Sequence, residues 1–256
     1  MNFENIGLNV CHITKKTGVF NDININVASK EQSKNVVIVP EIKLDEDDDE
    51  IIQHKPYRDL GSGNTRQILY VSGASGSGKS YYTACYMKEY HKMFPKNPIY
   101  IISSLDKDEK LDKIKNVRRI KLDEKFYNTK FTINDMKDSL FVYDDTEMIS
   151  NELIQEKITN IKNLILTTGR HTNTYLIITS HNTNAGLKTK LTLLEAHCIT
   201  IFLISMGDKA LKYLFETSFG FDKKQIQRIK ALNSRWVTVI RTFPMTILYE
   251  KGCFTL

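Results

Sequence analysis

From about residue 66 to the end of the chain, short apolar runs alternate with longer segments in which apolar residues recur at helical spacing. The apolar runs predict strands at residues 68–72, 99–103, 117–122, 140–144, 175–180, 199–204, 236–241 and 246–249. Helices are predicted at residues 79–92, 133–137, 151–166, 187–196, 208–217 and 222–232. Apolar strands that alternate with helices are typical of an α/β fold with a mainly parallel central sheet flanked by helices.

The first 65 residues follow a different pattern. Residues 20–27 alternate, with Ile23, Ile25 and Val27 on one face, which predicts a half-buried strand. A second short strand is predicted at residues 36–39, and residues 61–64 (GSGN) form a flexible joint. We therefore expect a small β-rich extension at residues 1–65 and one larger domain at residues 66–256.

Charge is distributed unevenly along the 256 residues. The formal net charge is +6, and six acidic residues without a basic one form the run Asp45–Glu50 (DEDDDE), so the rest of the chain carries +12. This run is predicted to be an exposed loop or a disordered segment. A basic body suits a polyanionic partner such as nucleic acid, but a lysine-rich, solubilising surface explains the same composition.

The chain begins with no recognisable secretory signal, and its longest apolar stretch is too short to cross a bilayer. The four cysteines are scattered, without the spacing of zinc ligands or of a redox pair, and are interpreted as reduced thiols. These features predict an intracellular protein with no membrane span.

A complete phosphate-binding loop follows the first predicted strand of the larger domain. It consists of Gly73, Ala74, Ser75, Gly76, Ser77, Gly78, Lys79 and Ser80 and fits G-x-x-x-x-G-K-[ST] at every position. Glycines allow the backbone to wrap around an anion, and the N–H groups at a helix start then face the phosphates. We expect ATP as ligand, Lys79 on its β- and γ-phosphates, and Ser80 on Mg²⁺.

The predicted strand at residues 140–144 ends in two carboxylates, Asp144 and Asp145. A carboxylate at such a strand end holds Mg²⁺ in phosphate-loop enzymes, so Asp144 is assigned to the metal. Asp145 is assigned to the attacking water, as orienting group or general base. Alternatively, Asp145 caps the following helix and Glu147 performs the chemistry.

Polar residues also end the predicted strand at 175–180. Ser180, His181 and Asn182 are alternative candidates for contact with the γ-phosphate, or they form an ordinary polar turn. Arg170 precedes this strand and is one of few arginines in a lysine-rich chain. Its guanidinium suits phosphate contact, across a subunit boundary as an arginine finger, or else it forms a structural ion pair.

With these segments in hand, the chain resembles the DNA-packaging ATPases of poxviruses and giant viruses, within the FtsK–HerA superfamily. The likeness rests on Gly73–Ser80, on residues 141–145, on Gly169-Arg170-His171 before the strand at 175–180, and on residues 233–241. It covers roughly residues 66–250. In relatives, the strand that corresponds to residues 175–180 usually ends with glutamine, and many relatives in the wider superfamily carry glutamate at the position of Asp145.

The resemblance implies an ATPase of the P-loop fold that forms a ring, usually a hexamer, and threads double-stranded DNA into a capsid. It implies the host cytoplasm, a viral factory or the virion as the location, and capsid or portal-vertex proteins as further partners. Arg170 would then complete a neighbour's site.

Three other classes compete with this interpretation. A small-molecule kinase shares the phosphate loop but needs an acceptor pocket and usually an arginine-bearing lid, and the sequence offers only Arg118-Arg119 in a charged connector. A GTP switch needs an Asn-Lys-x-Asp element, which is absent from the sequence. A nucleotide-binding assembly protein with little turnover stays open, and DNA-stimulated ATP hydrolysis discriminates it from a motor.

Overall fold

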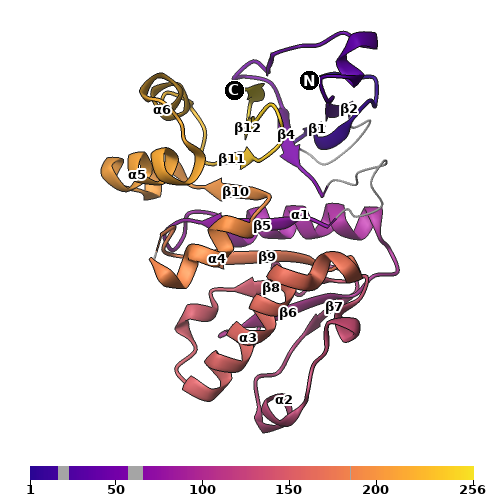
Figure 1. Cartoon of the computed structure of the whole chain (residues 1–256), viewed down its shortest axis with the longest axis vertical. Coiled ribbons are helices and arrows are strands. Elements are labelled where there is room, and N and C mark those ends of the chain that lie inside the picture. Colours follow the sequence, from indigo (N-terminus) through magenta and orange to yellow (C-terminus); the bar gives the residue numbers. More distant parts are fainter. Residues whose placement is uncertain (17–22, 57–65, 185) are drawn as a thin grey trace. The chain divides into compact units, whose positions relative to one another are not determined.

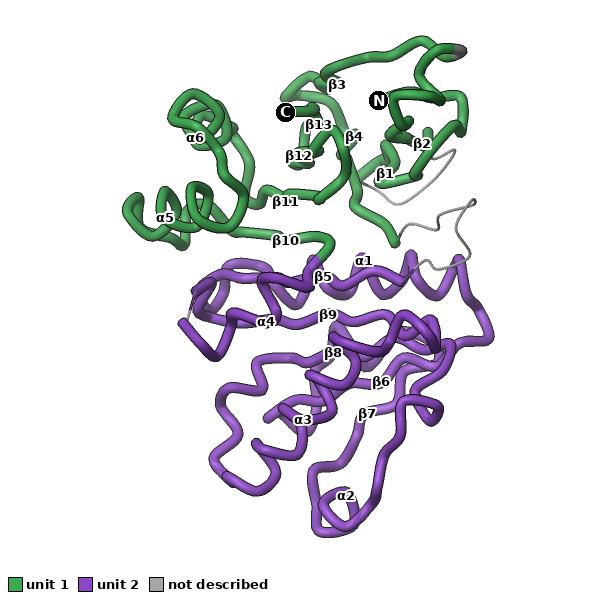
Figure 2. Tube along the Cα trace, in the orientation of Figure 1, with its two compact units in different colours: residues 1–63, 197–256 green, residues 64–196 purple. Residues whose placement is uncertain are grey.

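The computed structural model describes residues 1–16, 23–56, 66–184 and 186–256. The joint predicted at residues 61–64 and the start of the strand predicted at residues 20–27 lie outside these ranges. The chain divides into two compact units, coloured separately in Figure 2: residues 1–63 with 197–256 (unit 1), and residues 64–196 (unit 2). Residues 197–256 thus cluster with the N-terminal residues, whereas the sequence assigned them to the larger domain. The predicted domains remain a prediction.

Unit 2 contains a five-stranded parallel sheet. Its order is β5-β9-β8-β6-β7 (Figure 1). The strands are β5 (Ile68–Ser72), β6 (Ile99–Ser103), β7 (Val117–Arg119), β8 (Leu140–Asp144) and β9 (Tyr175–Ser180). Every residue of β5, β8 and β9 is buried. Strands that are apolar and buried along their whole length require cover on both faces, which helices supply.

Helical segments connect these strands, and one more follows β9. They are α1 (Lys79–Met93), α2 (Glu124–Asn128), η2 (Ile133–Met136), η3 (Thr146–Met148), α3 (Glu152–Thr168), η4 (Gly169–Thr172) and α4 (Leu187–Glu195). The helix starts follow the usual capping chemistry: Asn151 accepts a hydrogen bond from the Ile154 amide and so starts α3. Helix α3 contacts α4, and both α1 and α4 contact β5. The predicted mainly parallel sheet with flanking helices is confirmed.

Unit 1 is mainly antiparallel. One sheet has the order β2-β1-β4, and a run of five strands has the order β3-β13-β12-β11-β10. The strands are β1 (Leu8–Lys15), β2 (Ile23–Val27), β3 (Glu41–Lys43), β4 (Glu50–His54), β10 (Cys198–Ile201), β11 (Val237–Ile240), β12 (Thr246–Tyr249) and β13 (Gly252–Thr255). The helical segments are η1 (Gln32–Asn35), η5 (Leu203–Ser205), α5 (Asp208–Phe219) and α6 (Lys223–Lys230).

One sequence prediction in unit 1 needs correction. Residues 36–39 form no strand: Val37 and Ile38 are exposed, and the amides of this segment that bond to another segment do so singly, Val37 to Glu4 Oε1 and Val39 to Met1 O. Of the two alternatives for the acidic run, the structure has the exposed loop: it turns between β3 and β4, and the Lys251 ammonium donates to the carbonyls of Asp45, Asp48 and Glu50. Within the described residues, no helix is long and apolar enough to cross a bilayer.

Candidate functional site

The phosphate-binding loop connects β5 to α1 in unit 2, as the sequence predicts. Gly76 and Gly78 have φ angles of 75° and 112°, a region that only glycine enters at little cost. The Gly73 amide bonds to Ser180 O of β9 at 3.2 Å, and the Ser77 amide bonds to Ala74 O at 3.2 Å. Across the described residues, the amides of Gly76, Gly78 and Lys79 have no protein acceptor. A curved row of unsatisfied donors at a helix start is a ready anion site.

Lys79 is directed back over this loop. Its Nζ donates to Gly73 O at 2.9 Å and to Ala74 O at 3.4 Å, and only 6% of the side chain is exposed. Nζ also lies 3.3 Å from His181 Nδ1 and 3.8 Å from Asp145 Oδ2. A buried ammonium held above the loop amides is placed to bind phosphate oxygens.

The two carboxylates at the end of β8 differ in environment. Asp144 is 3% exposed and accepts hydrogen bonds from Thr179 Oγ1 at 3.2 Å and Ser103 Oγ at 3.3 Å. Burial raises the pKa of Asp144 above its ordinary value, the charge of Asp145 raises it further, and the two hydroxyls oppose both effects. Asp145 is 28% exposed and faces Lys79 and His181.

Asp145 has a left-handed backbone conformation, with φ 45° and ψ 40°. This conformation costs an ordinary residue on the order of 1 kcal/mol, and Asp tolerates it better than most. It starts η3 without a capping hydrogen bond from its side chain. The carboxylate is thus free of the capping role and is directed to the cations of the site, which favours the interpretation of Asp145 as a reacting residue.

His181 joins the lysine and the acid. Its Nδ1 lies 3.3 Å from Lys79 Nζ, and its Nε2 lies 3.1 Å from Asp145 Oδ2. With Nε2–H donating to Asp145, Nδ1 accepts from Lys79, so the neutral imidazole satisfies both contacts. Of the three residues at the end of β9 that the sequence left open, His181 is therefore the one brought to the phosphate lysine.

Ser180 and Asn182 have other contacts. Ser180 Oγ donates to Glu147 Oε1 at 2.6 Å and accepts from the Asn182 amide at 3.0 Å, while Tyr70 OH donates to Asn182 O at 2.6 Å. These bonds shape the turn after β9. Glu147, the alternative base, accepts a hydrogen bond from Ser180, whereas Asp145 lies 3.8 Å from Lys79 Nζ.

Arg170 lies at the opposite edge of the sheet. It belongs to η4, which precedes β9, whereas the phosphate loop follows β5, and the two strands are parallel with Ser72 beside Ser180. The side chain is exposed, with Nε 3.4 Å from His171 Nε2. Within one chain the structure therefore does not bring Arg170 to the phosphate loop.

The glycine beside it has a structural explanation. Arg66 is buried and donates from both terminal nitrogens to Ile165 O and Leu166 O, the last-turn carbonyls of α3. A Cβ on Gly169 would lie 2.5 Å from Arg66 Nη1. A side chain at position 169 would therefore have to displace the buried guanidinium that bonds to the end of α3. Sequence reasoning assigned no role to Arg66.

Sequence reasoning also missed Thr179 and Ser103, the hydroxyls that bond to Asp144. The register explains their position: Asp144 is paired with Ser103, and Tyr143 with Ile178, so Thr179 comes next to Asp144. The signal was a hydroxyl at the end of an otherwise apolar strand. Such residues are easily interpreted as turn-formers.

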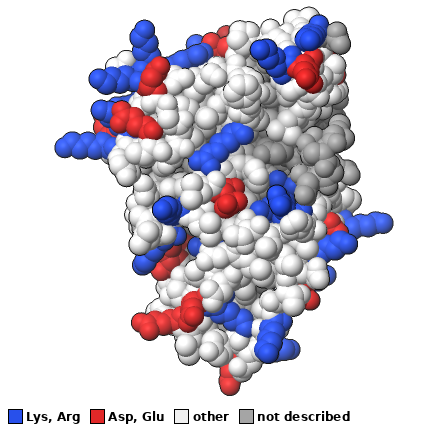
Figure 3. Space-filling view, in the orientation of Figure 1, with Lys and Arg blue, Asp and Glu red and all other residues white. Residues whose placement is uncertain are grey.

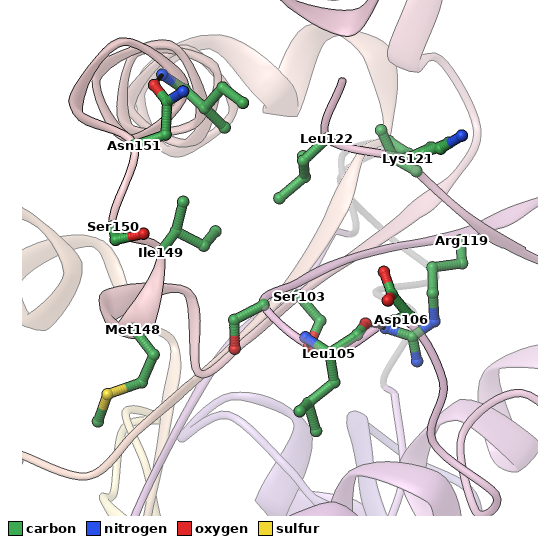
Figure 4. A pocket seen from close by; sticks show the side chains of 13 residues that line it. Ser103, Leu105, Asp106, Arg119, Lys121, Leu122, Met148, Ile149, Ser150 and Asn151 are labelled. Atoms are coloured by element: carbon green, nitrogen blue, oxygen red, sulfur yellow. Dashed lines mark hydrogen bonds between the residues drawn. The ribbon is translucent and has the colours of Figure 1, made fainter. Parts of the chain in front are cut away.

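A cavity of about 670 Å³ lies at the ends of β6 and β7, and Figure 4 shows its side chains. Ser103 and Leu105 after β6, Arg119 and Lys121 around the end of β7, and Met148 after Asp145 line it. Arg119 is already engaged, with Nη2 2.8 Å from Asp112 Oδ1 and Nη1 2.9 Å from Leu105 O. The cavity shares Ser103 with the site, because this hydroxyl donates to Asp144.

The residues assigned to Mg²⁺ fit that ion. Hydroxyl and carboxylate oxygens are the ligands that Mg²⁺ prefers, and it is bound through one or two carboxylates together with substrate phosphates. Asp144 is buried and receives hydrogen bonds only from neutral hydroxyls among the described residues, so a cation there would offset the cost that raises its pKa. Ser80 is half-buried in the first turn of α1.

The glycine loop between a buried strand and a helix, with an acidic strand end at the same edge of a parallel sheet, defines a P-loop NTPase fold. In sequence, the chain is 36% identical over 228 residues to the uncharacterized protein V3 of Sputnik virophage, covering 88% of this chain and 86% of V3. The chain therefore belongs to the same family as this virophage protein. No protein-family model matches the sequence.

Two solved structures resemble the chain in fold. The DNA-packaging ATPase B204 of Sulfolobus turreted icosahedral virus has a TM-score of 0.50 and 16% identity, over 72% of this chain and 98% of B204. TcpA, the conjugation coupling protein of pCW3, solved with ATPγS, has a TM-score of 0.50 and 11% identity, over 95% of this chain and 77% of TcpA. At such identities the likeness extends to the fold alone.

Proposed function

We propose that this chain is an ATP-hydrolysing motor that moves double-stranded DNA, with the packaging of a viral genome into its capsid as its task. The observation that carries the proposal is the convergence of Lys79, Asp145 and His181 over the phosphate loop, with Asp144 buried beside them. The kinship with a virophage protein and the fold shared with a packaging ATPase and a coupling protein support the choice of DNA as the substrate that is moved.

Each residue then has a defined task in hydrolysis. The amides of Gly73–Ser80 and the Lys79 ammonium bind the phosphates and balance the charge that builds on them. Asp145 orients the attacking water and takes its proton. His181 holds Asp145 and touches the γ-phosphate. Ser80 and Asp144 would hold Mg²⁺, which neutralises charge on the β- and γ-phosphates when bound.

Assembly into a ring is part of the proposal. The phosphate loop of one chain lacks an arginine among the described residues, and the exposed Arg170 is at the opposite edge. A neighbouring copy in a ring, which we expect to be a hexamer as in the FtsK–HerA superfamily, would bring its Arg170 to this loop. Capsid or portal-vertex proteins are the further partners that a packaging role requires.

DNA contact is expected to be electrostatic and independent of base sequence. Lys188 and Lys190 on α4, the helix that follows β9, are exposed and are our candidates for contact with DNA phosphates. On the face shown in Figure 3, basic side chains are interspersed with acidic ones and form no single patch. Affinity should therefore fall steeply with salt, through counterion release, for any duplex sequence.

The experiment is ATP hydrolysis with and without double-stranded DNA, at two salt concentrations. A DNA-translocating ATPase predicts turnover that rises with duplex of any sequence and loses this stimulation at high salt. Hydrolysis that ignores DNA would contradict the motor. Tight ATP binding with negligible turnover, with or without duplex, would instead favour a nucleotide-binding assembly protein.

The cavity favours one second candidate, a small-molecule kinase. The cavity is lined by Ser103, whose hydroxyl donates to Asp144, has room for a small acceptor, and presents Lys121 and Arg119. The bonds of Arg119 to Asp112 and Leu105 O leave this guanidinium little freedom to act as a mobile lid, which places the kinase second. Transfer of labelled γ-phosphate from ATP to nucleosides or nucleoside monophosphates, unaffected by duplex DNA, would reverse the order.

A further inference from the structure

The Thr179 hydroxyl lies between the two carboxylates of the site. Its Oγ1 is 3.2 Å from Asp144 Oδ1, 3.1 Å from Asp145 Oδ1, and 3.0 Å from the Asp145 main-chain nitrogen. The residue is 1% exposed and comes from β9, the strand beside the one that ends in the carboxylates. One buried hydroxyl thus contacts both acids that the proposed reaction uses.

The donors and acceptors fix what this hydroxyl does. It accepts from the Asp145 N–H, and it has one proton, so it donates to only one carboxylate at a time. The N–H contact holds the backbone of Asp145 at the left-handed angles that turn its side chain toward Lys79 and His181. The donated proton stabilises the negative charge of one carboxylate, which burial and the neighbouring carboxylate both disfavour.

Ser103 provides a natural comparison. Its hydroxyl donates to the other oxygen, Asp144 Oδ2, and accepts from the Leu105 amide at 3.1 Å. Within the part of the chain that the structure describes, Ser103 makes no hydrogen bond to Asp145, so it supports the metal carboxylate without supporting the reacting one. Thr179 touches both and Ser103 only one.

We infer that Thr179 is a positioning residue for the paired carboxylates, orienting Asp144 for the metal and Asp145 for the attacking water. The inference rests on the proposed ATPase for its catalytic half, whereas its metal half concerns binding alone. A partner of this kind, one bond removed from a metal ligand, typically changes metal affinity or activity by about 10- to 100-fold.

The test compares Thr179→Val, which keeps the shape and removes the hydroxyl, with Thr179→Ser, which keeps the hydroxyl. Two quantities are measured on the full chain: the Mg²⁺ concentration for half-maximal ATPγS binding, and kcat at saturating Mg²⁺ and ATP. We expect Thr179→Val to raise the first by about 10-fold or more and to lower the second by about 10-fold or more. Thr179→Ser should restore both toward wild type.

Ser103→Ala is the comparison for the metal half of the inference: it is expected to raise the Mg²⁺ requirement while lowering kcat at saturation less than Thr179→Val does. A Thr179→Val protein that folds and matches wild type in both measurements would overturn the inference, as would equal behaviour of the Val and Ser variants. If Thr179→Val fails to fold, Thr179→Ala with Thr179→Ser gives the same comparison. Should wild type bind ATPγS but not hydrolyse ATP, the proposed function fails while the Mg²⁺ measurement still decides the role of Thr179.

Discussion

At the carboxyl ends of β5, β8 and β9, charged side chains face one another, whereas at the amino end of β9 they are kept apart. Lys79, His181 and Asp145 form a continuous chain of contacts over the loop glycines. At the other edge, Arg66 donates to main-chain carbonyls of α3, and Arg170 is exposed, with Nε 3.4 Å from His171 Nε2. The comparison separates charge that has a local structural partner from charge that is presented to a ligand or another molecule.

The largest effect is expected at the carboxyl edge. Lys79→Ala removes the only side-chain cation of the loop and should abolish ATP turnover. The control is Lys88→Ala, an exposed lysine of the same helix α1 with the same change of net charge. Steady-state hydrolysis by the purified variants checks this. Near-normal turnover by Lys79→Ala would remove the phosphate-loop assignment altogether.

Replacing Arg170 tests whether the amino end of β9 in one subunit contributes to the phosphate loop of a neighbouring subunit. If Arg170 acts as an arginine finger, Arg170→Ala should lower ATP turnover by about 10³-fold or more. Mixing Arg170→Ala subunits with Asp145→Asn subunits pairs intact residues across some interfaces, because each variant keeps what the other lacks. Activity above that of either variant alone supports action between subunits. The absence of rescue in demonstrably mixed rings would speak against it.

The choice between Asp145 and Glu147 sharpens the description of the carboxyl edge. Asp145→Asn should retain ATP binding and lower kcat by about 10²- to 10⁴-fold, the usual contribution of a general base. Glu147→Gln should cost far less, because Glu147 is held by Ser180 and not by Lys79. ATPγS affinity and kcat are measured for both. The reverse ranking of the two kcat values would transfer the role of base to Glu147.

Gly169→Ala tests the structural contacts at the amino end of β9. The added Cβ would meet Arg66 Nη1 at 2.5 Å and displace the group that closes α3, with an expected loss of about 1–3 kcal/mol in unfolding free energy. Chemical denaturation measures it. Arg170→Ala, one residue along and exposed, is the control and should leave stability within about 0.5 kcal/mol. Equal stability of both variants would contradict the close approach described here.

The smallest expected effect is a gain in stability when Asp144 is replaced. Because burial and Asp145 raise the folded-state pKa of Asp144, the folded protein holds its proton more tightly than the unfolded chain. This favours folding at low pH, and the benefit is lost as pH rises through the raised pKa. Asp144→Asn should therefore stabilise the metal-free protein at neutral pH, with the difference shrinking in acid, and Mg²⁺ with ATPγS should stabilise wild type only. Thermal unfolding across pH is the measurement.

The sequence predicted what local patterns determine. The glycine loop, Lys79 and the acidic strand end are contiguous motifs, and the strands that carry them were placed at the bounds the structure has. It did not predict Thr179 or Ser103, because their role depends on the register between strands far apart in the chain. Strand β1 was missed because polar residues interrupt it, and the anchor of the acidic run is Lys251, some 200 residues away.

That anchor has a consequence for how the acidic loop can change over time. Lys251 holds the loop only through the main-chain carbonyls of Asp45, Asp48 and Glu50, so these bonds do not depend on which side chains the loop carries; a long side-chain bond also runs from Asn233 Nδ2 to Glu46 Oε1 at 3.5 Å. The side chains of residues 45–49 are exposed. Selection is therefore free to rewrite the charge of this loop, step by step, without disturbing the strands on either side, whereas the single lysine is constrained. Such a loop is an evolvable module, whose charge can change while the fold of the strands beside it stays the same.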